Sequence, residues 1–419
     1  SETHGIPVVE SQAGKSAMPW DHPLNFGPVG VTGAASANAI CETADLVLGV
    51  GTRFQDFTTG SWNLFQNPAR KLVSLNVAAY DAVKHGAIPL QCDALRGLGE
   101  VSQALGAFKA PAADGSLKAK WFASVDPLTD APDDSGANAL PTDQQVIGAV
   151  QRASGMDTVV MSAAGTMPGE LHKLWKAPRA GGYHMEYGFS CMGYEIAGAM
   201  GIKMAQPERD VVCMVGDGSY MMANSELATA AMMGISFTIV LTDNRGYGCI
   251  NRLQMGTGGA EFNNLLAHSH MGENSKIDFA AHAAAMGATS VHVKTIAELE
   301  AALRTPVLFE KWKAMQDEPD EVDKSLGVVD PGARVTGVQR DLKIELDART
   351  SLPHGRRVWR GSAALIGACG EVLVHALRLC TLRERRLMTS IGARRHLSRR
   401  ADTRSASASV SRRYVFGNA

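Results

Sequence analysis

The sequence lacks the cysteine spacing of a zinc site or of a disulfide framework. Its seven cysteines form no Cys-x-x-Cys pair. Isolated cysteines of this kind are typical of reduced thiols, so we expect a cytoplasmic protein. The sequence also has no run of 18 uncharged apolar residues and no basic-then-apolar signal segment at its start. It therefore predicts neither a transmembrane helix nor a secretory signal.

The composition is that of an ordinary globular protein, but the charge is unevenly distributed. Of the 419 residues, 45% are hydrophobic and 20% are charged, and this length is typical of two or three domains. The net charge is −1, yet residues 331–419 carry 17 Arg and 1 Lys against 6 acidic residues. The Arg-rich tail, defined here as residues 306–419, also lacks the strand and helix periods of the preceding chain. We expect it to be irregular or disordered.

Two explanations of the Arg-rich tail remain open. Clustered arginines neutralise phosphates, so the tail could be an arm that binds nucleic acid. However, aromatic side chains for base stacking are nearly absent from it, and Arg, Ala, Gly and Ser dominate, as in a segment translated out of frame from GC-rich DNA. We favour the second explanation and do not expect nucleic acid or a membrane as a partner.

The rest of the chain alternates short apolar runs with segments of helical pattern. This alternation predicts an α/β fold of two doubly wound parallel-sheet domains, with helices on both faces of each sheet. The expected divisions are a first domain at 1–105, a linker with some helix at 106–140, and a second domain at 141–305. The expected strands are 45–51, 71–77, 88–92, 157–161, 210–215, 236–242 and 288–293. The expected helices are 34–43, 142–153 with Thr142 as its N-cap, 225–233, 278–286 and 296–303.

Two polar residues follow apolar runs of the second domain. Asp217 lies in the motif Gly-Asp-Gly-Ser directly after the run 210–215, and Asn244 follows the run 236–242. Because strand, turn, helix and next strand form one right-handed βαβ unit, both side chains would lie at the carboxyl edge of the sheet. Their oxygens, with the Gly246 carbonyl, phosphate oxygens and a water, would suit octahedral Mg²⁺.

The other residues of this motif are suited to a diphosphate. Gly216 and Gly218 would let the backbone approach it closely, and Ser219 offers an N–H and a hydroxyl as donors. The plain alternative is an ordinary tight turn, followed later by an ordinary turn residue. The motif alone favours that alternative, whereas the paired spacing of Asp217 and Asn244 favours the ligand site.

The motif and the Asn 27 residues after its Asp resemble the cofactor signature of thiamine-diphosphate enzymes. The resemblance implies thiamine diphosphate and Mg²⁺ as cofactors, with Asp217, Asn244 and the Gly246 carbonyl as metal ligands. The second domain at 141–305 would then be the diphosphate- and Mg²⁺-binding domain.

Segments on either side of the motif resemble further cofactor contacts of this family. In segment 187–194, Met192 corresponds to the apolar residue that bends the cofactor, and the Ser190 carbonyl to the acceptor of its ring amino group. Without the resemblance, Met192 would be an ordinary core methionine. The loop after the run 157–161 resembles the other phosphate-side loop, which places Gly165 and Thr166 nearest the cofactor. Tyr247 is a further expected cofactor contact.

The resemblance covers about 1–305 and is densest with one branch of the family. Segments 10–15, 21–24 and 44–53 resemble the central domain of the decarboxylase and acetolactate-synthase enzymes, which implies a mostly structural first domain. Segments 165–172, 183–188 and 247–256 resemble the trihydroxycyclohexanedione hydrolases, which open a cyclic 1,2-diketone to 5-deoxy-D-glucuronate in myo-inositol breakdown. The resemblance thus implies a C–C bond hydrolase that is a homodimer or homotetramer in its full-length form.

The catalytic groups are less well defined. Members of the family take an activating Glu from a pyrimidine-binding domain of the facing subunit, and no such domain precedes Ser1. The chain therefore resembles a fragment that starts inside the central domain, and we expect weak cofactor binding and no turnover. His184 and Glu186 lie just before segment 187–194 and are candidate acid/base residues, although paired charges beside a cofactor loop are often structural.

Three alternatives remain. The first is an acetolactate-synthase-like carboligase or decarboxylase with the same cofactor site and another substrate. The second is a Rossmann-like nucleotide-binding protein, which the absence of a Gly-x-Gly-x-x-Gly motif with an acidic residue about 20 positions later disfavours. The third is nucleic-acid binding through the Arg-rich tail.

Overall fold

The computed structural model describes residues 1–131, 140–270 and 277–304. All of them belong to Ser1–Val322, one of the two units into which the chain divides. The Arg-rich tail lies outside the described residues, so both explanations of it stay predictions. Among the described residues, no helix combines the length and the apolar composition that crossing a membrane requires.

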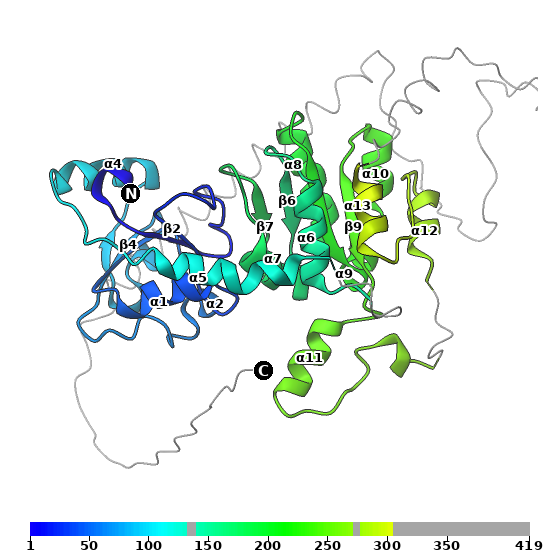
Figure 1. Cartoon of the computed structure of the whole chain (residues 1–419), viewed down its shortest axis with the longest axis horizontal. Helices are drawn as coiled ribbons and strands as arrows, with labels where there is room; N and C mark the ends of the chain where they lie inside the picture. The colour runs from blue at the N-terminus through cyan, green and yellow to red at the C-terminus, as the bar shows by residue number, and fades with distance from the viewer. Residues whose placement is uncertain (132–139, 271–276, 305–419) are drawn as a thin grey trace, which may run out of the picture. The chain divides into compact units, whose positions relative to one another are not determined.

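The first α/β part contains two small parallel sheets (Figure 1). One pairs β1 (Val8–Glu10) with β2 (Asn25–Pro28), and the other has the order β3-β4-β5, with bounds Leu46–Val50, Lys71–Leu75 and Ile88–Leu90. The helices are α1 (Ala35–Thr43), α2 (Asp56–Thr59), α3 (Ala79–Ala82) and α4 (Ala94–Leu105). The predicted strands at 45–51, 71–77 and 88–92 and the helix at 34–43 are confirmed, whereas β1 and β2 were not predicted.

One face of the sheet β3-β4-β5 is covered less completely than expected. Leu46, Leu48 and Val50, which alternate along β3, are 58%, 37% and 39% exposed. The two helices that follow β3 and β4 in the chain, α2 and α3, have only four residues each. Helices of a single turn cannot cover a whole sheet face, so apolar side chains of β3 remain at the surface.

The segment after α4 contains α5 (Ser116–Val125), which lies against α1 and β2. Short 3₁₀ turns lie at Glu2–His4, Lys84–Gly86, Asp126–Thr129 and Leu266–His268. Then α6 (Asp143–Ala153) begins at the predicted N-cap. The Thr142 hydroxyl accepts a hydrogen bond from the Gln145 N–H, and the Gln145 side chain accepts one from the Thr142 N–H. This capping box satisfies two backbone donors that the first turn of a helix otherwise leaves unpaired.

The second α/β part is built on a four-stranded parallel sheet of order β7-β6-β8-β9. The strands are β6 (Val159–Ser162), β7 (Tyr183–Met185), β8 (Val211–Gly216) and β9 (Thr238–Thr242). Besides α6, the helices are α7 (Thr166–Leu174), α8 (Tyr194–Ala205), α9 (Asp217–Ala223), α10 (Glu226–Met233), α11 (Gly248–Gly256), α12 (Phe279–Ala285) and α13 (Ile296–Arg304). The predicted strands at 157–161, 210–215 and 236–242 are confirmed, as are the predicted helices.

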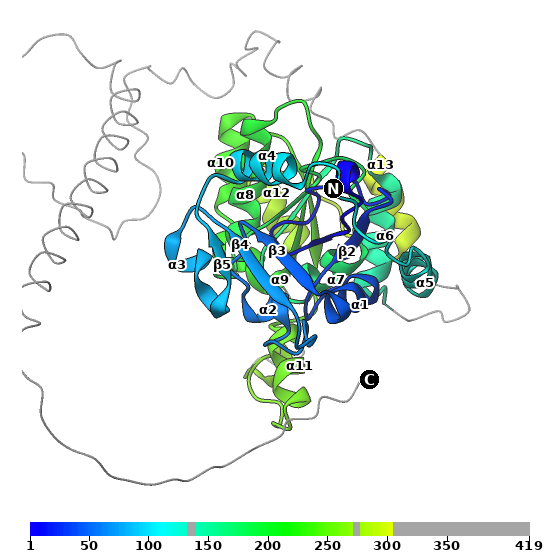
Figure 2. The same ribbon diagram turned by 90° about the vertical axis from the view of Figure 1, so that its left-hand side faces the viewer.

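The alternation of side chains along β8 separates two hydrophobic cores. Val212 and Met214 face a core that includes side chains of α6, α7 and α13. Val211, Cys213 and Val215 face the other side, where they pack with residues of α8, α9 and α10. Figure 2 shows α6 and α13 on one side of this sheet and α8 and α10 on the other. A strand buried on both faces accounts for the continuous apolar run at 210–215.

The strand predicted at 288–293 is wrong. These residues follow α12 without forming a strand, and Val291 is 66% exposed. Val293 and Ala288 are partly buried against the two different cores. The alternating apolar pattern thus reflects packing on two sides and not a hydrogen-bonded ladder. The unpredicted strand of this sheet is β7, which contains only three residues.

Buried hydrogen bonds connect the segment around β1 to the second α/β part. The Gln12 side-chain amide donates to the Pro168 carbonyl (3.0 Å), and the Tyr183 hydroxyl donates to the Gln12 side-chain oxygen (3.3 Å). The Tyr183 N–H donates to the Ser16 hydroxyl (3.1 Å). Such bonds are favourable because each buried polar group has a partner.

Candidate functional site

Asp217 and the segment after β9 meet at the carboxyl edge of the second sheet. Gly216, the last residue of β8, is in register with Thr242, the last residue of β9. One residue later, the Asp217 carboxylate accepts a hydrogen bond from the Gly246 N–H, with a distance of 2.8 Å between Oδ2 and the nitrogen. The parallel crossover therefore brings together residues that are 29 positions apart.

The Asn244 side chain completes this group. One end of its amide lies 2.7 Å from the Gly246 carbonyl oxygen and 3.3 Å from Asp217 Oδ1. With the NH₂ group at that end, Asn244 donates to both oxygens. With the amide oxygen at that end instead, oxygens of Asp217, Asn244 and Gly246 face one another with no hydrogen-bond donor between them. Such a group of oxygens attracts a cation. The structure thus brings together the three predicted metal ligands.

The Asp217 carboxyl is buried, with only 4% of the residue exposed. Burial raises its pKa, while hydrogen bonds from the N–H groups of Gly246, Gly218 and Asn244 oppose the shift and the charge of Asp243 adds to it. A buried carboxylate gains most from a neighbouring cation. Among the described residues, no group of three or more His, Cys, Asp or Glu side chains could hold a metal ion. A metal here would therefore depend on amide, carbonyl and ligand oxygens.

The predicted diphosphate residues Gly216, Gly218 and Ser219 lie at the start of α9. This helix begins at Asp217, and Gly216 is its N-cap. A Cβ atom added to Gly218 would lie 2.8 Å from the Tyr247 ring and 3.4 Å from Met192 Cε. The structure thus brings Gly218, Tyr247 and Met192 together. The Ser219 hydroxyl is buried and has no hydrogen-bond partner in the described part of the chain. An unsatisfied buried hydroxyl at this position is consistent with a ligand that accepts its hydrogen bond.

The second predicted phosphate-side loop follows β6, the strand next to β8. Gly165 is the N-cap of α7 and has φ 102°, which favours glycine. The side chain of Thr166, the next residue, accepts a hydrogen bond from the Arg252 guanidinium of α11. Sequence reasoning did not identify Arg252. The contact joins α11, the helix after the Asn244 loop, to the start of α7.

Glu195 is a second residue that sequence reasoning missed. It is fully buried, and its carboxylate accepts hydrogen bonds from the Gly193 N–H (2.9 Å) and the Ala164 N–H (3.3 Å). These two amides belong to segment 187–194 and to the loop after β6, respectively. The signal was available, since Glu195 is the one acidic residue of α8 and lies in its first turn.

Segment 187–194 has a strained backbone that Glu186 supports. Ser190 has φ 54°, a left-handed conformation that non-glycine residues rarely adopt. The Glu186 carboxylate accepts hydrogen bonds from the N–H groups of Phe189 (3.0 Å) and Cys191 (2.7 Å). Its modest burial raises the pKa of Glu186, but the hydrogen bonds to Cys191, Phe189 and Gly188 outweigh this effect and lower it. Glu186 thus orders the loop that contains Ser190.

His184, the other candidate acid/base residue, lies on β7. Its Nε2 is 3.4 Å from the Tyr194 hydroxyl, and the two rings are stacked with centroids 6.2 Å apart. Partial burial lowers the pKa of His184. The imidazole is therefore neutral near pH 7.

Comparison with known protein families gives matches in both parts of the chain. Residues 163–312 match the thiamine pyrophosphate enzyme family's C-terminal TPP binding domain, and residues 1–101 match its central domain. The chain belongs to the thiamine pyrophosphate enzymes. The predicted family and α/β fold are confirmed, while the roles of the individual site residues stay predictions.

Curated relatives among the thiamine pyrophosphate enzymes agree with the predicted branch. A "3D-(3,5/4)-trihydroxycyclohexane-1,2-dione hydrolase" of Bacillus anthracis is 39% identical over 335 residues, which cover 72% of this chain and 52% of the relative. A protein of the same name from Geobacillus thermodenitrificans is 40% identical over 330 residues, which cover 72% of this chain and 51% of the relative. The chain spans about half the length of these relatives.

Proposed function

We propose that this chain carries the thiamine diphosphate- and Mg²⁺-binding part of a C–C bond hydrolase. Its substrate would be 3D-(3,5/4)-trihydroxycyclohexane-1,2-dione, opened to 5-deoxy-D-glucuronate. The substrate assignment rests on the two hydrolase relatives, which share 39% and 40% identity with the chain. The cofactor assignment rests on the close approach of the Asp217 carboxylate, the Asn244 side-chain amide and the Gly246 carbonyl.

The residues present fit a magnesium ion and a diphosphate. The Asp217 carboxylate, the Asn244 amide oxygen and the Gly246 carbonyl would hold Mg²⁺, which prefers six oxygen ligands and retains waters and phosphate oxygens. The unpartnered Ser219 hydroxyl would donate to the diphosphate. Met192 and Tyr247, which pack at Gly218, would form the apolar wall beside it.

When bound, thiamine diphosphate supplies the carbon nucleophile and the electron sink for C–C bond cleavage. The chain's own residues would orient it and move protons. His184 fits a proton-accepting role better than Glu186 does, because the Glu186 carboxylate already accepts two backbone hydrogen bonds. The lowered pKa of His184 keeps its imidazole neutral at pH 7, the form that a general base requires before it takes up a proton.

Calorimetric titration with thiamine diphosphate and Mg²⁺ tests the cofactor assignment. Wild type should bind only when both are present. Asp217→Asn should weaken binding at least about tenfold, which corresponds to about 1.4 kcal/mol. Asp210→Asn is the matched control, because this exposed carboxylate lies just before β8, at the opposite end of the strand from Asp217. Equal affinities of wild type and Asp217→Asn would refute the proposed metal site.

The substrate class needs a separate measurement. Because no turnover is expected of this chain by itself, a full-length form of the enzyme is incubated with the cyclic dione and, in parallel, with pyruvate. The comparison distinguishes the hydrolase from an acetolactate-synthase-like carboligase. Consumption of the dione with appearance of an open-chain acid supports the proposal. Consumption of pyruvate alone would favour the carboligase.

A further inference from the structure

An open pocket lies in the first α/β part, at the amino ends of β4 and β5. It has a volume of about 510 Å³ and is lined by Trp62, Phe65, Gln66, Asn67, Pro68, Arg70 and His85. These residues define the Arg70 pocket. Segment 62–70 leads into β4, and the turn Lys84–Gly86 leads into β5. The proposed cofactor function, at the carboxyl edge of the other sheet, uses none of the residues in this pocket.

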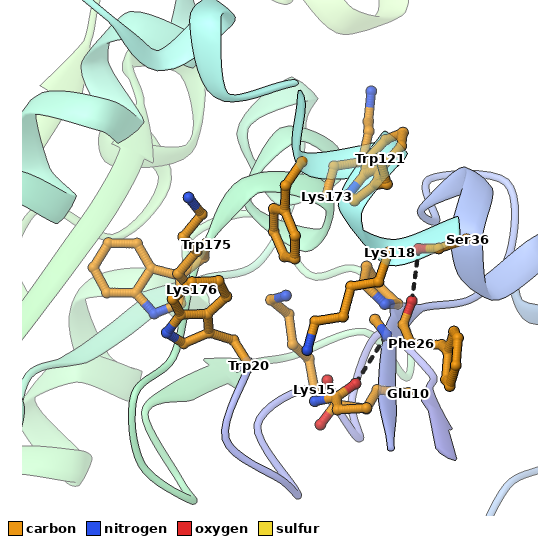
Figure 3. Close-up of a pocket in the computed structure, with 14 residues that line it drawn as sticks. Glu10, Lys15, Trp20, Phe26, Ser36, Lys118, Trp121, Lys173, Trp175 and Lys176 are labelled. Carbon is orange, nitrogen blue, oxygen red and sulfur yellow. Dashed lines mark hydrogen bonds between the residues drawn. The ribbon is translucent and has the colours of Figure 1, made fainter. Parts of the chain in front are cut away.

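The Arg70 pocket differs from the pocket between the segment around β1 and β2, helix α5 and the end of α7 (Figure 3). In that second pocket every lysine has a carboxylate close enough to act on its charge. The pairs are Lys15 with Glu10, Lys118 with Asp21, Lys173 with Glu170, and Lys176 with Asp126. Its charges are thus compensated from within the chain, which is not the case in the Arg70 pocket.

Arg70 provides the positive charge of its pocket. Its Cζ lies 5.5 Å from the centre of the Trp62 ring, and its Nε is buried without a hydrogen-bond partner among the described residues. Within the same part of the chain, the guanidinium forms no ion pair. A contact with an aromatic face compensates only partly for missing hydrogen bonds. The terminal nitrogens are not buried, so they can donate to an acceptor that comes from outside the chain.

No carboxylate of the described residues pairs with Arg70, and no acidic residue lines the pocket. Asp81, which is close to His85 in the chain, forms an ion pair with Lys84 at 2.7 Å. The Asp45 carbonyl accepts a hydrogen bond from the N–H of the residue after Arg70 at 2.8 Å, but the exposed Asp45 carboxylate is beyond ion-pair distance of Arg70. The pocket is therefore positively charged and favours an anion.

Two further side chains of the pocket can donate hydrogen bonds. The rings of Trp62 and His85 have centroids 4.5 Å apart, and neither the indole N–H nor the imidazole has a hydrogen-bond partner in residues 1–131, 140–270 and 277–304. The amide groups of Gln66 and Asn67, by contrast, already donate to backbone carbonyls of the surrounding loops. The pocket thus offers donors from three side chains.

The backbone around these donors is strained. Trp62, Phe65 and His85 have φ angles of 66°, 61° and 58°, in the left-handed region. Bulky residues rarely adopt this conformation. Strained backbone of this kind concentrates at sites that hold a ligand, where it fixes side chains in the orientation that binding requires. The strain and the unpaired donors therefore coincide in one pocket.

We propose that the Arg70 pocket binds a phosphomonoester, whose phosphate accepts hydrogen bonds from the terminal nitrogens of Arg70. The planar fork of a guanidinium matches the geometry of phosphate oxygens. A phosphomonoester has three terminal oxygens, as many as the donor side chains, whereas a carboxylate has two. A volume of about 510 Å³ also leaves room for the organic part of the ester against Phe65 and Pro68.

Calorimetric titration without thiamine diphosphate and Mg²⁺ tests the binding. Glucose 6-phosphate and AMP are the probes, and glucose and adenosine are the controls that lack the phosphate. At least one ester should bind about tenfold or more tightly than its control. The ester that binds more tightly identifies the organic part as a sugar or a nucleoside. Failure of both esters to bind, or binding equal to that of their controls, would overturn the proposal.

Substitution of Arg70 tests the assignment to this pocket. Arg70→Gln should weaken binding of the ester at least about tenfold, and Arg70→Lys, which keeps the charge but not the fork, should weaken it less. Arg96→Gln is the matched control, because this exposed arginine of α4 pairs with Glu100 at 3.2 Å, and its affinity should equal that of wild type. An unchanged affinity in Arg70→Gln would overturn the proposal.

Crystallography supplies a readout that needs no variant. Arsenate replaces phosphate and scatters X-rays anomalously. Crystals of the whole chain soaked in sodium arsenate should show an anomalous peak within hydrogen-bond distance of the terminal nitrogens of Arg70. No peak at saturating arsenate, or peaks only elsewhere, would overturn the proposal. Because thiamine diphosphate is left out, this result does not depend on the proposed cofactor function.

Discussion

The carboxylate of Asp217 accepts a 2.8 Å hydrogen bond from the N–H of Gly246, and this contact ties the start of α9 to the loop after β9. Gly246 has φ 141°, and a Cβ atom there would lie 2.4 Å from the Asn264 carbonyl oxygen. Only glycine fits this position. One residue without a side chain therefore donates to Asp217 and presents its carbonyl to Asn244.

Gly218, in the candidate site, and Gly201, in α8, provide a matched pair of substitutions. Gly218→Ala would place a Cβ atom 2.8 Å from the Tyr247 ring, so the ring must move away from the first turn of α9. We expect thiamine diphosphate affinity to fall at least about tenfold, measured by calorimetry.

The Gly201→Ala variant serves as the control for Gly218→Ala. Gly201 lies inside α8 and is not a predicted cofactor contact, and a Cβ atom there meets nothing within 4 Å. We expect its thiamine diphosphate affinity to stay near that of wild type. Equal affinities of the two variants would show that the packing of Tyr247 on Gly218 does not shape the site.

Glu195 should stabilise both loops of the candidate site. Glu195→Gln keeps the shape of the side chain but turns an NH₂ group toward one of the two backbone N–H donors, Ala164 or Gly193. A buried donor facing a donor costs about 1–3 kcal/mol in the free energy of unfolding. Urea denaturation measures this loss. Glu208→Gln, at an exposed position of the same domain, should be neutral; a similar loss in both variants would argue against the bridging role of Glu195.

His172 should make the protein sensitive to acid. Its Nδ1 donates to the Thr32 carbonyl at 3.1 Å, while the buried Nε2 has no partner among the described residues. Burial, and next the charge of Lys15, lower the pKa of His172 to about 3. The unfolded imidazole takes up a proton near pH 6.5 and the folded one does not, so this contribution to stability is present above pH 6.5 and is lost as the pH falls toward 3.

The His172 prediction is checked by comparing urea unfolding at pH 7, 6 and 5. Below pH 6.5 the free energy of unfolding of wild type should fall by up to about 1.4 kcal/mol per pH unit because of this one group. His172→Asn can still donate to the Thr32 carbonyl but does not titrate. The free energy of unfolding of this variant should therefore change less steeply with pH, by the contribution of about one proton. Parallel slopes in both proteins would refute the assignment.

Gly148, inside α6, should resist substitution because of a close backbone approach. A Cβ atom there would lie 1.9 Å from the Thr129 carbonyl oxygen, so Gly148→Ala should destabilise the fold by about 1–3 kcal/mol. Gly201→Ala in α8 meets nothing within 4 Å and should stabilise the helix by about 0.5–1 kcal/mol. Thermal unfolding compares the two, and a stabilised Gly148→Ala would contradict the packing of α6 on the turn at Asp126–Thr129.

Local signals allowed much of the fold to be predicted. The N-cap at Thr142 and the continuous apolar run of β8 each identify one element from neighbouring residues alone. The failures have non-local causes. Strand β7 is too short for a periodic pattern, and segment 288–293 alternates because its residues pack against two cores, which only the assembled sheet reveals.

By itself the sequence determined the α/β class, the family and the candidate metal ligands, because the residues at strand ends and their spacing are local properties that a parallel crossover converts into proximity. Tertiary structure alone decided that the Asn244 amide reaches both Asp217 and Gly246 and that Glu195 joins two loops. Contacts of this kind depend on how elements pack in three dimensions, and no spacing along the chain encodes them.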